Sequence, residues 1–386
     1  MKSTYLSTLT PLRGIAALFV VVMHAHLFLG RIVSPTLTHF VAEGWLWVDF
    51  FFMLSGFVLS HVYSQTFAEP VSRLRFRKYI SARFARVYPL HFFTLLWVAI
   101  ITIVIRQATN PIDPFLLPIF SYRAIPASLL LVQSLHLFTV PPLNTPSWSL
   151  STEWWVYLIF PALVYGLQRC SAWGKGLVLL TTAGLYVMLM YYIAPNFGLT
   201  HTVTIDLMAD WGLFRCLAGF ILGMLCYETY RQNWGRLVLG SSLFFVLSFG
   251  AVLVTMHRAA HDLFIIALFP FIILSAAYQT GWVKRLLDAP PLQRLGDWSF
   301  SIYMVHMPII FTVYLVQVFA GSDISVYFNP NPVNPDYANG QLMAVLLVLL
   351  TLIISALTYR FIEVPIRNYL NDRFNTQRKE PIAVAM

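Results

Sequence analysis

Charged residues are scarce in this sequence: Asp, Glu, Lys and Arg make up only 11% of its 386 residues. A soluble globular domain carries roughly 25% charged residues. The hydrophobic share is 58%, so too few polar side chains remain to cover a surface that faces water. These proportions exclude an ordinary soluble enzyme and favour a protein that is embedded in a lipid bilayer.

Cysteine is almost absent as well, and its three positions, Cys170, Cys216 and Cys226, form no CxxC pair. An odd number of widely separated cysteines argues against a disulfide framework and against a Cys-based zinc site. His24 and His26 are two residues apart, a spacing that points side chains apart on a helix. We therefore expect no metal site.

No polar linker divides the chain, and its apolar segments have the length of membrane-spanning helices, about 20 residues. We predict an all-α, polytopic membrane protein with one transmembrane domain, residues 1–365, and a short basic cytoplasmic tail, residues 366–386. No small-residue cleavage site follows the first apolar run, which we interpret as a span. The predicted spans number about ten: 11–30, 44–64, 88–106, 148–168, 175–194, 211–230, 237–256, 261–279, 297–319 and 341–362.

The positive charges support this topology. With the N-terminus inside and the spans alternating, 20 of the 25 Lys and Arg residues fall on the inner side, 4 fall outside and Arg215 lies within a span. Cytoplasmic loops of membrane proteins carry such an excess of Lys and Arg. We therefore expect both termini in the cytoplasm. Because topology explains the net charge of +9, nucleic acid is not an expected partner.

A shorter apolar piece, about 126–138, lies between the predicted third and fourth spans and is bounded by prolines. It is too short to cross a bilayer, which takes about 20 residues. We predict an interfacial or re-entrant helix there.

Several ionisable residues fall inside the predicted spans, where each costs at least about 2.5 kcal/mol to insert. His24 lies on the first span, eleven residues beyond Arg13 and roughly 16 Å deeper. Asp49, Glu153 and Arg215 lie near the outer ends of three further spans. Four different spans thus place ionisable groups in one depth band, which predicts a single polar chamber in the outer half of the membrane.

Each of these residues also has a purely structural interpretation. Arg13 can anchor the topology, and the His24 ring can be hydrogen-bonded to a backbone carbonyl. Asp49 and Glu153 lie near helix N-termini, where the helix dipole favours a carboxylate by roughly 0.3–1 kcal/mol. Arg215 can neutralise one of these carboxylates. His306 has a structural interpretation too, because it lies beside a proline that kinks a helix.

A second cationic cluster precedes the third span, in RLRFRKYISARFARVYP. Positive-inside anchoring and contact with lipid headgroups account for part of it. Arg83 and Arg86, however, are spaced i, i+3 and share a helix face. Paired guanidiniums suit the binding of phosphate, so this spacing is compatible with a phosphorylated, water-soluble ligand on the cytoplasmic side.

At this level of detail the chain resembles the membrane-bound acyltransferase family 3, whose members include O-acetyltransferases of lipopolysaccharide O-antigen and exopolysaccharides. The resemblance runs almost from end to end and rests on motifs that follow one another in order along the chain: LTPLRGIAALFVVVMH with Arg13 and His24, GWLWVDFFFMLSGFVLS with Asp49, RFARVYP with Arg83 and Arg86, PSWSLSTEWWVYLIFP with Glu153, FRCLAGFILGML with Arg215, and finally SFSIYMVHMPI and YRFIEVPIR with Tyr303, His306 and Glu363.

The resemblance implies an acyl donor made in the cytoplasm, usually acetyl-CoA, and an acceptor hydroxyl on a glycan or lipid-linked saccharide at the outer face of the cell inner membrane. Arg13, Arg83 and Arg86 would then bind the phosphates of coenzyme A. His24 is our candidate general base, since an unperturbed imidazole has a pKa of about 6.5. Glu153 or Asp49 would orient the imidazole.

Some alternatives stay open at this stage. Arg215 would hold a carboxylate or stabilise an oxyanion. Direct transfer is the simpler scheme, but an acyl-enzyme intermediate on His24 is a second scheme. Intramembrane charges also mark transport pathways, so a transporter of an acylated or anionic small molecule is the rival function. The sequence does not identify the acceptor; segments 106–147 and 320–340 are expected to face it.

Overall fold

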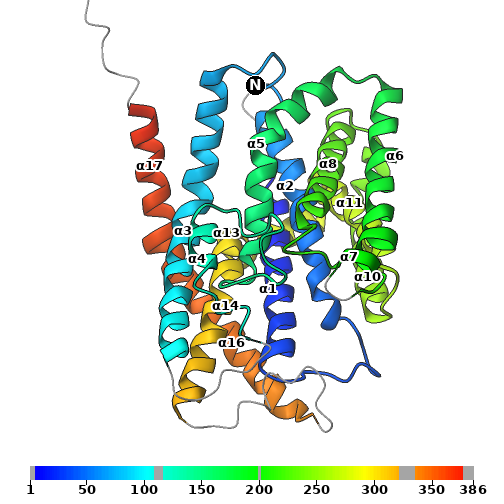
Figure 1. Ribbon diagram of the computed structural model, residues 1–386. Helices are drawn as coiled ribbons and strands as arrows, with labels where there is room; N and C mark the ends of the chain where they lie inside the picture. Colours follow the sequence, from blue (N-terminus) through cyan, green and yellow to red (C-terminus); the bar gives the residue numbers. More distant parts are fainter. Residues whose placement is uncertain (1–4, 108–115, 199–200, 321–334, 377–386) are drawn as a thin grey trace, which may run out of the picture.

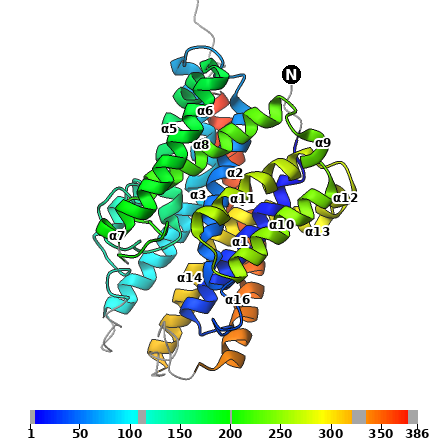
Figure 2. The same ribbon diagram turned by 90° about the vertical axis from the view of Figure 1, so that its right-hand side faces the viewer.

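The computed structural model describes residues 5–107, 116–198, 201–320 and 335–376, and over these residues it is helical without any strand. The all-α prediction is therefore confirmed. The helices form one elongated bundle, in which the start of α1 and the end of α17 lie at the same end (Figures 1 and 2). That arrangement agrees with an even number of crossings, whereas the cytoplasmic location of this end remains a prediction.

Seven helices of the described residues are long and apolar enough to cross a membrane. They are α1 (Leu9–Phe28), η1 with α2 (Ala42–Leu46 and Trp47–Tyr63), α3 (Arg73–Gln107), α6 with η2 and α7 (Ala172–Met188, Leu189–Ile193 and Ala194–Phe197), α8 (Gly212–Arg231), α14 (Ser299–Phe319), and α16 with η3 and α17 (Tyr337–Thr358, Tyr359–Glu363 and Val364–Thr376).

The other helices are shorter or less apolar. They are α4 (Ala124–Leu129), α5 (Ser147–Arg169), α9 (Arg236–Leu239), α10 (Ser242–His257), α11 (Asp262–Tyr278), α12 (Trp282–Leu287) and α13 (Pro290–Asp297). Each of the predicted spans overlaps one of the helices in these two groups. The multi-pass architecture is therefore confirmed, and the number of ten crossings remains a prediction.

Two helices extend well beyond the predicted spans. Helix α3 begins at Arg73, 15 residues before the predicted start, so the cationic cluster is part of a helix of 35 residues, about 52 Å long. Helix α16 runs through the π turn η3 into α17, which packs against α3. The first part of the predicted tail, residues 366–376, is thus helical, and residues 377–386 lie outside the described residues.

Helices α2 and α8 pack closely against each other in the bundle core, because glycines remove the side chains between them. A Cβ atom at Gly223 would lie 1.9 Å from the carbonyl oxygen of Met53, and one at Gly56 would lie 2.1 Å from that of Phe220. Small residues allow such close contact between helices in membranes. This contact fixes the residues that α2 and α8 present to each other.

The segment between α3 and α5 folds back into the bundle, as predicted, but it is less helical than predicted. Within its described residues, 116–146, only α4 is helical, at mid-height of the bundle in Figure 1, and positive φ angles at Leu131 (55°) and His136 (61°) follow it. The buried Gln133 donates to the carbonyl oxygen of Ser147 at the start of α5. Helix α5 consequently starts inside the bundle. The predicted acceptor-facing segments are only partly described, since 108–115 and 321–334 lie outside the described residues.

Candidate active site

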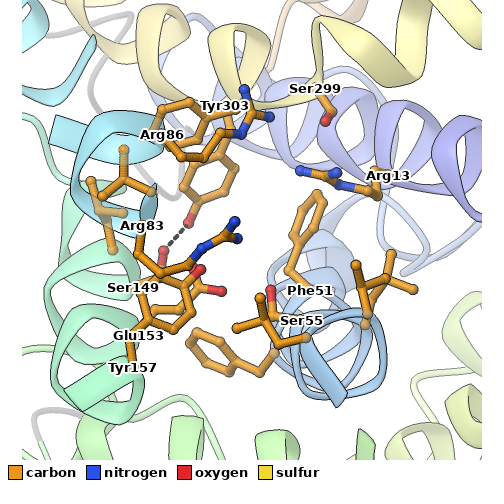
Figure 3. A pocket seen from close by; sticks show the side chains of 17 residues that line it. Arg13, Phe51, Ser55, Arg83, Arg86, Ser149, Glu153, Tyr157, Ser299 and Tyr303 are labelled. Carbon is orange, nitrogen blue, oxygen red and sulfur yellow. Dashed lines mark hydrogen bonds between the residues drawn. The ribbon is translucent and has the colours of Figure 1, made fainter. Parts of the chain in front are cut away.

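A cavity opens between helices α1, α2, α3, α5 and α14 (Figure 3). Counted with its open mouth, the empty space amounts to about 930 Å³. We call it the arginine pocket, because Arg13, Arg83 and Arg86 line it together with one carboxylate, that of Glu153. The remaining lining residues are uncharged: Phe51, Phe52, Leu54, Ser55, Val58, Leu59, Val87, Ser149, Leu150, Tyr157, Ser299, Phe300 and Tyr303.

The three arginines that we predicted to bind the donor therefore meet in one place, although Arg13 comes from α1 and the others from α3. In Figure 3 the guanidiniums of Arg13 and Arg83 reach into the opening from different sides. The buried Nε of Arg83 has no hydrogen-bond acceptor among the described residues. An anion would supply that acceptor, so this set of donors fits the phosphates of an acyl-CoA.

Arg86 has a different environment from the other two arginines. Its Nη1 is ion-paired with Oε1 of Glu363, which is only 1% exposed, and its guanidinium lies 5.5 Å from the ring of Phe300. Among the described residues, no carboxylate lies within 4.0 Å of the Arg13 or Arg83 guanidinium in the same way. The pocket thus holds one arginine in a direct ion pair and two that are not in one.

Glu153 lies in the arginine pocket and not in an outer chamber, so its predicted depth is wrong. Its carboxylate interacts with the hydroxyls of Ser55 and Tyr157 and with the charges of Arg13 and Arg83. Ser55 lies six residues along α2 from Asp49, which is about 9 Å towards the end of the bundle where α1 begins. The error arose because we started α5 at the outer surface, whereas the re-entrant segment starts it inside the bundle.

Asp49 and Arg215 form a separate ion pair between α2 and α8. The Arg215 Nη2 lies 2.6 Å and its Nε 3.2 Å from Oδ2 of Asp49, and both side chains are fully buried. Asp206 lies 3.5 Å from the same guanidinium, and the indole rings of Trp45 and Trp148 flank it at 5.0 and 5.5 Å. Neither Asp49 nor Arg215 lines the arginine pocket, and their contacts agree with the neutralising interpretation of Arg215.

His24 forms a third group, with a partner that the sequence reasoning set aside. The Nδ1 of His24 lies 2.9 Å from the carbonyl oxygen of Val20 and 3.3 Å from Nε2 of His306. The Nδ1 of His306 lies 3.1 Å from the carbonyl oxygen of Ile302. In the described part of the chain, neither Asp49 nor Glu153 is a hydrogen-bond partner of the His24 ring.

These contacts assign the tautomers of the two imidazoles. Carbonyl oxygens only accept hydrogen bonds, so the Nδ1 atoms of His24 and His306 both carry hydrogen in the neutral rings. The single Nδ1–H of His24 is then shared between the Val20 carbonyl oxygen and the Nε2 of His306, and the Nε2 of His24 keeps its lone pair. A general base needs such a lone pair. After the Nε2 of His24 had taken up a proton, its Nδ1–H would still have its hydrogen-bond acceptors.

Tyr303 connects the arginine pocket with the histidine pair. It lines the pocket, its hydroxyl lies 2.8 Å from Oγ of Ser149, and its ring centroid lies 6.1 Å from that of His306. The polar residues that we predicted to share one chamber are therefore divided: Glu153 is in the pocket, His24 is paired with His306, and Asp49 is held by Arg215. The predicted single chamber is wrong, because helix contacts pair these side chains separately.

The sequence reasoning missed the roles of Ser149, Tyr303, His306 and Glu363. Tyr303 and Glu363 were named only as members of the matched C-terminal motifs, His306 also had a structural interpretation, and Ser149 was not singled out. In α5 the residue before the helix is Pro146, and Ser149 donates to its carbonyl oxygen. No spacing within one helix relates these residues to His24 or Arg86, so the motif match was the only signal available.

Comparison with known proteins agrees with this architecture. A family model described as an acyltransferase domain matches residues 9–360. The chain is 30% identical over 324 residues to acyltransferase MdmB of Streptomyces mycarofaciens, an alignment that covers 79% of each chain. It is also similar to O-acetyltransferase OatA of Staphylococcus aureus, with 24% identity over 389 residues; this match covers 94% of the chain and 57% of OatA.

Proposed function

From the premise that the chain belongs to acyltransferase family 3, and is therefore a membrane O-acyltransferase, we propose that it transfers an acetyl group from cytoplasmic acetyl-CoA to a glycan hydroxyl. The acceptor is an extracytoplasmic glycan or a lipid-linked saccharide, such as a lipopolysaccharide or exopolysaccharide unit, and the enzyme resides in the cell inner membrane. The observation that carries the donor assignment is the convergence of Arg13, Arg83 and Arg86 in one pocket.

The pocket residues have distinct roles in this proposal. The arginines bind the phosphates of a donor that enters from the end of the bundle where α1 begins (Figure 1), with Arg13 in the second turn of α1 and Arg86 paired with Glu363 just before α17. Tyr303 is hydrogen-bonded to Ser149 in the pocket wall, and its ring also contacts that of His306. A thioester that passes these two side chains would approach His24, while its phosphates stay among the arginines.

His24 is the proposed general base. Its Nε2 takes the proton of the acceptor hydroxyl, the hydroxyl oxygen attacks the thioester carbon, and the carbon–sulfur bond breaks to release the coenzyme A thiolate, which regains a proton. His306 and the carbonyl oxygen of Val20 orient the ring and stabilise the imidazolium through Nδ1. This role was assigned to a carboxylate in the sequence-based hypothesis.

Acetyl transfer in proteoliposomes tests the proposal. The purified chain would be supplied with labelled acetyl-CoA on one side and a saccharide acceptor on the other, and His24→Ala would be compared with His39→Ala, a histidine that does not contact His24 or His306. We expect loss of labelled acceptor with His24→Ala only, at a reduction of about 100-fold or more. Full transfer by His24→Ala would remove the base assignment, and uptake of label without an acylated product would favour the transporter.

A further inference from the structure

Glu363 lies at the point where the last long helix changes its winding. The π turn η3, Tyr359–Glu363, separates α16 from α17, and Glu363 is its only buried residue. A π turn adds a residue to the helix and occurs frequently at functional sites. It turns the Glu363 side chain inward although its neighbour Phe361 is 63% exposed. A buried carboxylate is costly unless it is paired, so its partners show what it stabilises.

The partners of Glu363 come from three helices. Its Oε1 is ion-paired with Arg86 of α3 and lies 3.5 Å from Nη1 of Arg367 on α17, while Ser301 of α14 donates to Oε2 at 2.9 Å. Arg86 lines the arginine pocket; Glu363, Arg367 and Ser301 do not. The carboxylate therefore holds one wall residue of the pocket from behind, through contacts that are all outside the pocket.

This arrangement leaves part of the Arg86 guanidinium available to donate hydrogen bonds to a ligand in the pocket. A guanidinium has five N–H donors, so an arginine that is fixed by a carboxylate on one edge still presents donors on its other edge. The Arg86 side chain is 20% exposed, whereas that of Glu363 is 1% exposed. A side chain held in place before binding loses less conformational entropy when a ligand arrives.

We propose that Glu363 is a positioning residue of the donor pocket: its buried carboxylate holds the Arg86 guanidinium at the pocket wall, so that α17 contributes to the binding of the anionic donor without touching it. The inference rests on the proposed function, because it takes coenzyme A phosphates as the ligand of the arginine pocket.

Glu363→Gln is the informative variant, because it keeps the shape of the side chain and removes its charge. The matched control is Glu228→Gln, which removes a comparably buried carboxylate that pairs with Lys175 and Arg231 away from the pocket. The full chain in lipid nanodiscs would be titrated with coenzyme A, and KM and kcat for acetyl-CoA would be measured on the same preparations.

We expect Glu363→Gln to raise the Kd for coenzyme A and the KM for acetyl-CoA about tenfold, with kcat within about twofold of the wild type and Glu228→Gln unchanged. In a double-mutant cycle, Glu363→Gln should weaken binding no further once Arg86→Gln is present. A general loss of structure would lower kcat and would add to the effect of Arg86→Gln.

The outcomes separate this inference from the proposed function. Wild-type affinity in a folded Glu363→Gln protein would overturn the positioning role alone, whereas a wild-type protein that does not bind coenzyme A would overturn the donor assignment and this inference with it. If Glu363→Gln does not fold, Ser301→Ala tests the positioning role instead, since it removes a hydrogen bond to Glu363 from outside the pocket. An unchanged Kd in Ser301→Ala would then count against the role, and a rise of about twofold or more would support it.

Discussion

The imidazoles of His24 and His306 meet across helices α1 and α14, with 3.3 Å between Nδ1 of His24 and Nε2 of His306. His306 is fully buried and its Nδ1 is directed at its own helix, so its Nε2 is the atom left to accept from His24. In the proposed mechanism the pair acts as a dyad in which a neutral imidazole replaces the usual carboxylate.

This relationship predicts different effects for two substitutions of His306. His306→Leu removes the acceptor and should lower kcat by about 100-fold, the smaller end of what a positioned base contributes. His306→Gln keeps an acceptor near the position of Nε2 and should stay within about tenfold of the wild type. Steady-state acetyl transfer measures both, and KM for acetyl-CoA should not change because His306 does not line the pocket. Equal kcat values for His306→Leu and the wild type would contradict the dyad.

Arg83→Ala should weaken donor binding without slowing the chemical step. A hydrogen bond to a charged group contributes about 1.5–3 kcal/mol, so KM for acetyl-CoA should rise roughly 10- to 100-fold. Arg73→Ala is the matched control, because Arg73 lies at the exposed start of the same helix and does not line the pocket. Similar KM changes in both variants would mean that the cationic cluster acts through its general charge.

Glu153→Gln should strengthen donor binding, which is the opposite of the effect expected for Arg83→Ala. Its carboxylate is in the pocket with Arg13 and Arg83, and it repels an anionic ligand there. Removing the charge should tighten coenzyme A binding by about two- to fivefold and slow turnover, because the product leaves more slowly. Titration with coenzyme A and measurement of kcat test both parts, and weaker binding of coenzyme A would show that Glu153 supports the donor site in another way.

Asp49→Asn should affect stability more than donor binding. The variant leaves the fully buried Arg215 without its main counterion, and breaking a buried pair in this way costs about 3–5 kcal/mol. Thermal unfolding in detergent should show a large decrease in Tm. Asp288→Asn, which breaks the partly exposed pair with Lys284, should cost at most about 1 kcal/mol. Coenzyme A should still bind the folded fraction of Asp49→Asn, since Asp49 does not line the pocket.

The amino-acid sequence was sufficient to predict the class of the protein and most of its elements. Scarce charge and apolar runs of membrane length predicted a helical membrane protein, and every predicted span overlaps a helix. The i, i+3 spacing of Arg83 and Arg86 predicted a shared helix face, and both residues line one pocket. Each of these signals is local, because it depends on composition or on helix periodicity over a few turns.

What the sequence by itself determined, then, is the helical membrane architecture and the arginines that line the pocket. Only the tertiary structure decided which ionisable side chains meet: Asp49 with Arg215, Arg86 with Glu363, and His24 with His306. The members of these pairs are separated by 166, 277 and 282 residues along the chain. Helix periodicity gives the face on which a side chain lies but not the helix opposite it. The re-entrant start of α5, which moves Glu153 into the arginine pocket, likewise depends on packing between distant segments.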